Sequence, residues 1–394
     1  MSEHRPPLPG AIWALGFVSL LMDVSSELIH SLLPVFMVGA LGASASMLGL
    51  VEGVAEATAL IVKVFSGVIS DALGKRKPLT LFGYGLGAAS KPLFALATGV
   101  GGVLAARFID RIGKGLRGAP RDAMIADLTT REQRGAAYGL RQALDTVGAM
   151  LGPVLAIGLM LGLHGDFRTV FWVAVLPGML SVAVLAVFVR EPSAKGEGLR
   201  RQKISRESLR EFSGEFWAVV AVGVVFTLAR FSEAFLVLRG QQALGLPLAW
   251  APAVMVGMNL VYALSAHPFG KLADRMDRTV LLIAGLAALV LADLLLAWGG
   301  GLVGIALGVA FWGLHMGMTQ GLMSAMVADS APARLRGSAF GIFNLASGVA
   351  MLAASVIAGV LWDAFGAPAA FGTGAVFALL AALMLLLRRL RRSG

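Results

Sequence analysis

The chain has 394 residues, of which 57% are hydrophobic and only 14% are charged, and its formal net charge is +10. A soluble domain carries roughly 25% charged residues and could not bury this much apolar surface, so the composition argues against a soluble enzyme, a nucleic-acid binder and a disordered protein. It favours an all-α polytopic membrane protein. Cysteine is absent, which excludes disulfides and thiolate metal ligands.

Twelve apolar runs are long enough to cross a membrane, for which a helix needs about 20 mostly apolar residues. In chain order they lie at 11–38, 47–70, 79–98, 102–125, 137–162, 169–189, 215–238, 250–272, 279–298, 302–327, 338–361 and 369–387. The longest polar stretch divides them. We therefore predict an N-terminal six-helix bundle over 1–189, a cytoplasmic linker over 190–214 and a C-terminal six-helix bundle over 215–394. Within the linker, 200–212 is either an amphipathic surface helix or a flexible tether.

Lys and Arg are concentrated in alternate loops. These loops hold residues 75–77, 131, 134, 275, 278, 334 and 336, the linker, and the tail at 388–392, whereas the opposite loops hold little more than Arg168 and Arg239. By the positive-inside rule, we predict that both termini are cytoplasmic. We expect the protein to lie in the inner membrane of the cell. Most of the net charge is explained in this way, so we expect membrane lipids and no nucleic acid as partners of the basic loops.

The chain repeats itself at an offset of 202 to 203 residues. GVISDALGKRK at 67–77 matches GKLADRMDRTV at 270–280, and the block from Asp127 to Gly139 matches the block from Asp329 to Gly341. The first two segments follow the second and eighth spans, and the other two follow the fourth and tenth spans. Because a shift of six spans preserves orientation, the halves are predicted to be parallel repeats related by an axis along the membrane normal.

The repeated loop resembles a motif of the major facilitator superfamily (MFS). Its residues are Gly67, Asp71, Gly74, Lys75 and Arg76 after the second span, and Gly270, Asp274, Arg275 and Arg278 after the eighth. The fifth span adds Gly148, Gly152 and Pro153, which resemble the Gly-x-x-x-Gly-Pro motif of exporters, although Ala156 and Ile157 match the rest of that motif only in part. The stretch 106–127 resembles a bacterial and archaeal branch of efflux-type permeases without an assigned substrate.

The resemblance implies twelve helices in two parallel six-helix repeats and a secondary active transporter, not an enzyme. It also implies a conformational role for the loop motifs. Gly67 would allow close helix approach, and Asp71 would join Arg121 to latch the cytoplasmic side in the outward-open state. Gly148, Gly152 and Pro153 would shape the fifth span.

Charged side chains inside a bilayer cost a few kcal/mol each, so they are candidate functional residues. At 100° per residue, those of the fourth span share one face, as do those of the first and of the second. The candidates for proton coupling are Asp23, Glu27, Glu52 and Glu56. The candidates for the substrate cavity are His30, Arg107, Asp110, Arg111, Lys114, Arg117, Asp145, Arg230, Glu233, His315 and Gln320.

Two alternatives stay open for these charges. The carboxylates can take up protons during transport, or they can pair with the basic residues of the fourth span and only hold helices together. Likewise, the basic residues can bind an anionic substrate or be neutralised. The offset of 203 residues maps Glu27 onto Arg230, which predicts a pair between the two halves in one transport state; the alternative pairs Arg230 with Glu233 and Glu27 with an arginine of the fourth span.

The predicted function is proton-coupled efflux of a small organic solute or drug by alternating access. The alternative is proton-coupled transport, by uptake or export, of an organic anion or metabolite. A channel would have no use for two rocking halves with latch motifs. A membrane enzyme is disfavoured because no nucleotide-binding loop occurs and the five histidines lack metal-ligand spacing. We expect no metal and no cofactor, and a monomer whose partners are lipids, protons and a small-molecule substrate.

Overall fold

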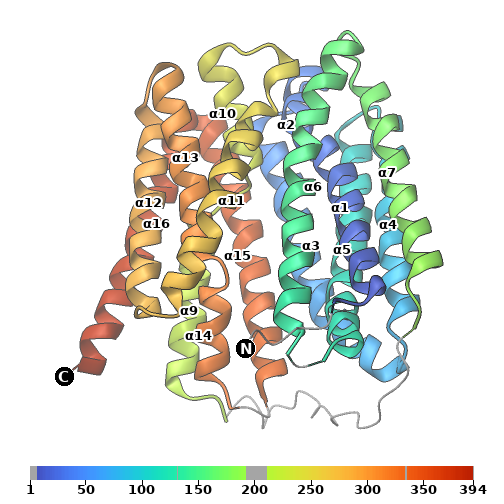
Figure 1. Cartoon of the computed structure of the whole chain (residues 1–394). Coiled ribbons are helices and arrows are strands. Elements are labelled where there is room, and N and C mark those ends of the chain that lie inside the picture. The colour runs from blue at the N-terminus through green and yellow to red at the C-terminus, as the bar shows by residue number, and fades with distance from the viewer. Residues whose placement is uncertain (1–6, 131, 192–210, 333–334, 394) are drawn as a thin grey trace. The chain divides into compact units, whose positions relative to one another are not determined.

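The computed structural model describes residues 7–130, 132–191, 211–332 and 335–393, and the described chain is helical throughout, without strands (Figure 1). Its helices are α1 (Gly10–His30), α2 (Leu33–Val35), the π-helix η1 (Phe36–Ala40), α3 (Ala45–Leu73), α4 (Lys77–Leu96), α5 (Val100–Leu128), α6 (Arg134–Gly162), α7 (Phe167–Phe188), α9 (Gly214–Leu228), α10 (Ala234–Leu244), the 3₁₀-helix η2 (Leu248–Trp250), α11 (Ala253–Ala273), α12 (Arg278–Trp298), α13 (Gly301–Thr319), α14 (Leu322–Ser330), α15 (Arg336–Phe365) and α16 (Ala367–Ser393). Residues 192–210 of the predicted linker lie outside the described residues.

All twelve predicted spans are helical, which confirms the all-α class. Eight helical segments among the described residues are long and apolar enough to cross a membrane by length and composition alone. The remaining predicted spans are α3, α4 and α5, and the seventh span, which is divided into α9 and α10. Each of the first three carries at least one charged side chain within its predicted span.

Three spans are interrupted, which the apolar pattern did not predict. The first changes at Ser31 into a short turn followed by α2 and η1, the seventh breaks over 229–233, and the tenth breaks between α13 and α14. Gly321 supplies the left-handed conformation at the third break, with φ of 74°. The first and seventh spans are repeat mates, and interrupted spans at matching positions often mark the substrate site of a transporter.

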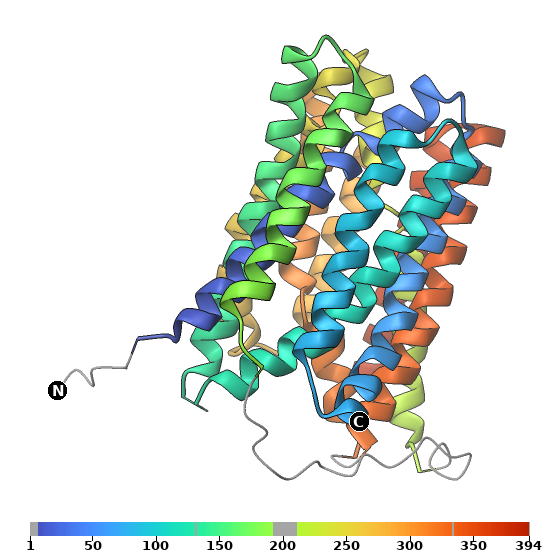
Figure 2. The ribbon, with the colours of Figure 1, turned by 90° about the vertical axis from the view of Figure 1, so that its right-hand side faces the viewer.

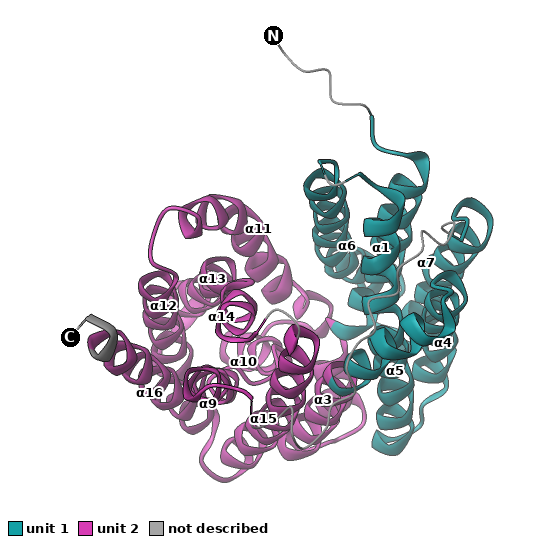
Figure 3. Cartoon of the chain, turned by 90° about the horizontal axis from the view of Figure 1, so that it is seen from below, with its two compact units in different colours: residues 1–30, 61–198 teal, residues 31–60, 199–394 magenta. Residues whose placement is uncertain are grey.

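The chain forms two compact units (Figure 3). Unit 1 contains residues 1–30 and 61–198, and unit 2 contains residues 31–60 and 199–394, so that α3 contributes to both. Residues 31–60 of the predicted N-terminal bundle thus group with unit 2. The division into repeats over 1–189 and 215–394 therefore stays a prediction from the sequence, and the units are described separately below.

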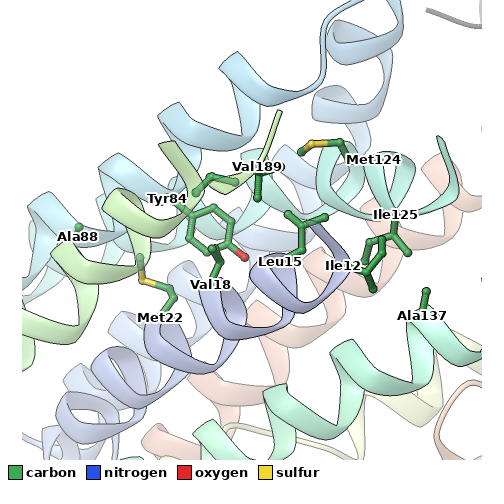
Figure 4. Packing of buried hydrophobic residues seen from close by; sticks show 11 residues of the cluster. Ile12, Leu15, Val18, Met22, Tyr84, Ala88, Met124, Ile125, Ala137 and Val189 are labelled. Atoms are coloured by element: carbon green, nitrogen blue, oxygen red, sulfur yellow. The ribbon is translucent and has the colours of Figure 1, made fainter. Parts of the chain in front are cut away.

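In unit 1, α4 packs on α5 and α7, while α1 packs on α6 and α7 (Figure 2). The apolar core between these helices includes Tyr84, whose ring lies beside Val18 of α1 (Figure 4). Glycine permits the close approach of α4 and α5, because a Cβ on Gly113 would lie 2.6 Å from the carbonyl oxygen of Gly83. This contact brings the polar faces of both helices toward α1.

In unit 2, α12 packs on α13 and α16, α13 packs on α11, and α15 packs on α9 and α16. The first half of α3 also belongs to this unit and lies along α15. A Cβ on Gly359 would lie 2.5 Å from the carbonyl oxygen of Ala45, and Asp363 accepts hydrogen bonds from the backbone N–H groups of Ala45 at 2.9 Å and Ser46 at 2.8 Å. The α15 carboxylate thus caps the N-terminus of α3.

Candidate transport site

A fully buried ion pair occupies the interior of unit 1. Lys91 of α4 is 0% exposed, and its Nζ donates to Oδ1 of Asp110 at 2.7 Å and to the Ser26 hydroxyl at 2.9 Å. Asp110 comes from α5 and is 2% exposed. Charges so deep in a protein persist only when they are paired and hydrogen-bonded. The pair therefore fixes α1, α4 and α5 to one another.

His30 extends this pair into a chain of polar groups. Its Nε2 lies 3.6 Å from Oδ2 of Asp110, and its Nδ1 lies 3.6 Å from Oε1 of Glu27. The guanidinium of Arg107 contacts Nε2 closely. Because a guanidinium can only donate, Nε2 accepts, and we assign the ring proton to Nδ1, which faces Glu27. The sequence candidates Glu27, His30, Arg107 and Asp110 thus form one network with Lys91.

Further basic side chains continue along α5. Arg117 is buried, lies over the Tyr84 ring with Cζ 4.8 Å from its centroid, and leaves Nη1 without a hydrogen bond. Arg121 donates to the hydroxyls of Ser19 at 3.0 Å and Tyr84 at 3.3 Å. Arg111 approaches Asp110 at 4.0 Å. Part of the positive charge of α5 therefore lies in contacts with α1 and α4.

Asp145 of α6 belongs to a separate pair. Its Oδ2 lies 2.8 Å from Nη1 of Arg141 one turn earlier on the same helix, and its buried Oδ1 has no hydrogen-bond partner. Asp145, Arg117 and Lys114 act electrostatically on Asp23, and Lys114 acts on Glu27 as well. Asp23 is therefore influenced by both a cationic helix and the carboxylate of Asp145, whereas Glu27 is influenced by the cationic helix.

The glycines of the exporter-like motif lie against the Cβ atoms of the two acidic residues of α1. A Cβ on Gly148 would lie 3.0 Å from Cβ of Asp23, and one on Gly152 would lie 2.6 Å from Cβ of Glu27. Glu27 remains partly accessible, with 22% of its side chain exposed. The α6 glycines thus let α6 approach α1 at the two acidic positions, a juxtaposition that the motif alone did not predict.

The other two coupling candidates belong to unit 2. Glu52 is 4% exposed and accepts a hydrogen bond at 3.1 Å from the hydroxyl of Ser232, which lies in the break of the seventh span. Glu56 follows one turn later on α3 and is partly exposed. The structure therefore groups Asp23 with Glu27 in unit 1 and Glu52 with Glu56 in unit 2.

The remaining cavity candidates also lie in unit 2. Arg230 is in the break, where Glu233 and Tyr262 act on it electrostatically. His315 is fully buried, with Nδ1 at 2.8 Å from the carbonyl oxygen of Gly285. Gln320 is exposed at the end of α13. The influence of Glu233 on Arg230 agrees with the local pairing, while the predicted Glu27–Arg230 pair joins different units and stays a prediction.

The loop motifs form the same ion pair in both repeats. Nε of Arg76 lies 2.6 Å from Oδ2 of Asp127 in unit 1, and Nη1 of Arg278 lies 2.5 Å from Oδ2 of Asp329 in unit 2. Each pair differs from its mate by 202 positions, so Arg76, and not Lys75, is the structural counterpart of Arg278. This equivalence supports the internal repeat by geometry.

Asp71 and Arg121 have separate partners in unit 1. Asp71 accepts from Nη1 of Arg76 at 2.9 Å, whereas Arg121 donates to Ser19 and Tyr84. Burial lowers the pKa of the Arg76 guanidinium, but hydrogen bonds to Asp71 and Asp127 raise it above its usual value, so the loop pair stays ionised. The Asp71–Arg121 latch was predicted for the outward-open state and stays a prediction.

Sequence reasoning missed several residues that the structure brings to these sites. Lys91 was overlooked because it is a single cation in an apolar run. Tyr84 and Ser232 carry no charge, and their importance depends on contacts between helices. No group of three or more His, Asp or Glu side chains suited to a metal ion occurs in the part of the chain that the structure describes.

Comparisons with known proteins agree with this architecture. The model of the family described as Major Facilitator Superfamily matches residues 15–258 and 241–394. The chain is 31% identical to the uncharacterized MFS-type transporter MJ1317 of Methanocaldococcus jannaschii, over 98% of this chain and 96% of that protein. It is also 31% identical to the class C tetracycline resistance protein of Escherichia coli, over 71% of this chain and 72% of that protein.

A solved structure shares the fold. The human organic anion transporter MFSD10 superposes with a TM-score of 0.66 at 20% identity, covering 97% of this chain and 100% of that one. The match of the family model along nearly the whole chain, together with the helical architecture and the repeated loop pair, places the protein among multi-pass membrane transporters and not among enzymes. The chain belongs to the Major Facilitator Superfamily.

Proposed function

We propose that the protein exports a small organic solute in exchange for protons, by alternating access. The observation that carries the proposal is the contact of Gly148 with Asp23 and of Gly152 with Glu27. It joins a motif similar to that of exporters to two carboxylates inside the membrane. A change in the packing of α6 on α1 would alter the surroundings of both acids, which is what coupling of proton uptake to conformation requires.

Glu27 is the better coupling residue of the two. Its partly exposed carboxylate can exchange a proton with water. Nδ1 of His30, to which we assign the ring proton, lies 3.6 Å from Oε1 of Glu27. Asp110, by contrast, is held by Lys91 and is buried. Proton uptake by Glu27 would weaken its attraction to the cations of α5 and loosen α1 from α5, whereas the Lys91–Asp110 pair would keep the bundle assembled.

The setting proposed for this activity is the inner membrane, with both termini in the cytoplasm and a monomer as the working unit. The charge bias of the loops supports the orientation. The class C tetracycline resistance protein, a relative, supports efflux as the direction.

Inside-out membrane vesicles test the proposal. Respiration acidifies their interior, and a pH-sensitive quenching dye reports whether an added compound releases protons from it. We expect at least one member of a panel containing tetracycline, quinolones and aromatic acids to relieve quenching in wild-type vesicles. Glu27→Gln should abolish this response at an unchanged protein level.

The matched control is Glu215→Gln, which removes a carboxylate that is 48% exposed and paired with Arg388 at a helix end. It should leave the response intact. Uptake of a radiolabelled panel compound without any release of protons, or a fully active Glu27→Gln variant, would contradict the proposal.

A second candidate is transport of an organic anion. Arg230 favours it, because Nε of its guanidinium is buried without a hydrogen-bond partner at the break of the seventh span. The two candidates share one mechanism of coupling and differ in the charge of the solute.

A further inference from the structure

The break in the seventh span is held by specific contacts. Ser232 receives a hydrogen bond from the N–H of Ala234 at 3.2 Å and donates to Glu52 at 3.1 Å, and its own N–H donates to the Ser355 hydroxyl at 3.3 Å. Irregular backbone at membrane depth is tolerated only inside protein or beside a water-filled cavity. Because three hydrogen bonds hold this break, it is a defined part of the structure of unit 2.

Arg230 is the cation of this break. Helix α9 ends two residues before Arg230, and the backbone N–H of Arg230 donates to the carbonyl oxygen of Thr227 at 3.0 Å. Its Cζ lies 5.6 Å from the centroid of the Phe226 ring, and Nε has no hydrogen-bond partner among the described residues. Arg230 is half-buried, and its guanidinium lies over an aromatic ring with a buried donor left unused, an arrangement that suits a planar carboxylate.

His315 lies beside the same ring. Its centroid is 5.7 Å from that of Phe226, and Arg230 acts on it electrostatically. Because Nδ1 contacts the Gly285 carbonyl, the ring proton belongs on Nδ1, and Nε2 is an acceptor that is buried without a partner. A cationic donor and a neutral acceptor thus flank one aromatic side chain, with hydrogen-bonding capacity left on both.

We infer that Arg230, Phe226 and His315 form a binding site for a flat organic carboxylate that also carries a hydroxyl or amino group. The carboxylate binds Arg230, the flat body packs against Phe226, and the hydroxyl or amino hydrogen is donated to Nε2 of His315. The inference rests on the proposed transport function and names the chemical class of its solute. Glu233, which acts on Arg230, is the internal carboxylate with which the solute competes.

Equilibrium binding to the purified full-length protein tests the site. The probes are 4-hydroxybenzoate and benzoate, with benzyl alcohol and benzylamine as neutral and cationic analogues, and the readouts are the melting temperature and intrinsic tryptophan fluorescence. We expect saturable binding of 4-hydroxybenzoate, weaker binding of benzoate and none of the other two. Equal binding of benzyl alcohol and benzoate would overturn the inference.

Variants assign the contacts. Arg230→Lys keeps the charge but loses the planar fork, and should weaken 4-hydroxybenzoate binding at least about tenfold. The matched control is Arg239→Lys, because Arg239 donates to the carbonyls of Leu296 and Ala297 and faces no proposed ligand. His315→Phe should remove the preference for 4-hydroxybenzoate over benzoate. Unchanged affinity in Arg230→Lys, or an unchanged preference in His315→Phe, would contradict the site.

Glu233→Gln supplies a test in the opposite direction. Removing the competing carboxylate should tighten 4-hydroxybenzoate binding, and weaker binding would count against the inference. Failure of these tests would remove the carboxylate site while leaving proton coupling measurable in vesicles. Conversely, binding that depends on Arg230 without proton release would preserve the site and refute the exchange mechanism.

Discussion

The two units differ in how their most deeply buried charges are satisfied, although Arg117 and Asp145 of unit 1 also keep buried atoms without a hydrogen bond. In unit 1, Lys91, Asp110 and His30 lie in one network in which the cation and the carboxylate satisfy each other. In unit 2, both carboxylate oxygens of Asp293, Nε of Arg230 and Nε2 of His315 are buried without hydrogen-bond partners. Partnered charges stabilise a bundle in one arrangement, whereas unpartnered ones retain the capacity to bind. The comparison suggests that unit 1 couples to protons and unit 2 recognises the solute.

Lys91→Met is expected to have the largest effect on this contrast. It leaves the Asp110 carboxylate buried without its principal counter-charge, which should cost about 3–5 kcal/mol of the free energy of unfolding. Unfolding in detergent–denaturant mixtures measures the loss. The double variant Lys91→Met/Asp110→Leu should recover much of it, whereas additive losses from the two substitutions would show that the pair is not the source of the stability.

The α1–α6 contact provides the next largest effect. Gly152→Ala places a Cβ 2.6 Å from Cβ of Glu27 and 2.9 Å from the backbone nitrogen of Leu28, so it should cost about 1–3 kcal/mol and impair proton release. Gly158→Ala is the control on the same helix, because a Cβ there meets nothing within 4 Å. That substitution should be neutral or stabilising by up to about 1 kcal/mol. Equal behaviour of both variants would rule out a specific contact.

A smaller effect is expected at the cap of α3. Asp363→Ala removes the acceptor of two backbone N–H groups and should cost about 1 kcal/mol. Hydrogen–deuterium exchange of a peptide covering residues 45–50 should become faster, while the start of α7, capped by Asp166 in unit 1, serves as the internal reference. Unchanged exchange at residues 45–50 would mean that the cap does not protect this end of α3.

The smallest effect is predicted for Asp293→Asn. Because its carboxylate makes no hydrogen bond in the described structure, the amide loses none, and we expect a change in the free energy of unfolding below about 1 kcal/mol. Asp110→Asn, the matched substitution in unit 1, should cost several times more in the same assay. Equal costs at the two positions would abolish the contrast between the units.

The sequence alone predicted a large part of the fold, because the signals for spans are local. Twenty-residue apolar runs, short turns and loop charge identify the helices without knowledge of their packing. The repeat was also visible, although its register became clear only when the Arg76–Asp127 and Arg278–Asp329 pairs were seen together. The breaks in the first, seventh and tenth spans escaped the pattern because each is short and the apolar run continues on both sides of its few polar residues.

For the candidate site, helical periodicity singled out the first, second and fourth spans for their charged faces, but it gave no sign of the buried charge on α4. It could not identify the partners, because a charge on one helix face says nothing about the face opposite. Lys91 shows this most clearly: one lysine in an apolar run has no periodic signature, yet it holds Asp110 at 2.7 Å. The glycines of α6 were recognised as a motif, but their contact with Asp23 and Glu27 depends on the register of two helices.

The amino-acid sequence by itself determined the number of spans, their predicted orientation, the repeat and the membership of a transporter class, since each follows from composition and short-range pattern. Only the tertiary structure decided which charges are neutralised and which keep unused hydrogen bonds. That outcome depends on distances of a few ångströms between helices far apart in the chain, where desolvation and pairing nearly balance. Arg230 is the example, because its value as a binding group comes from the partner that its Nε lacks.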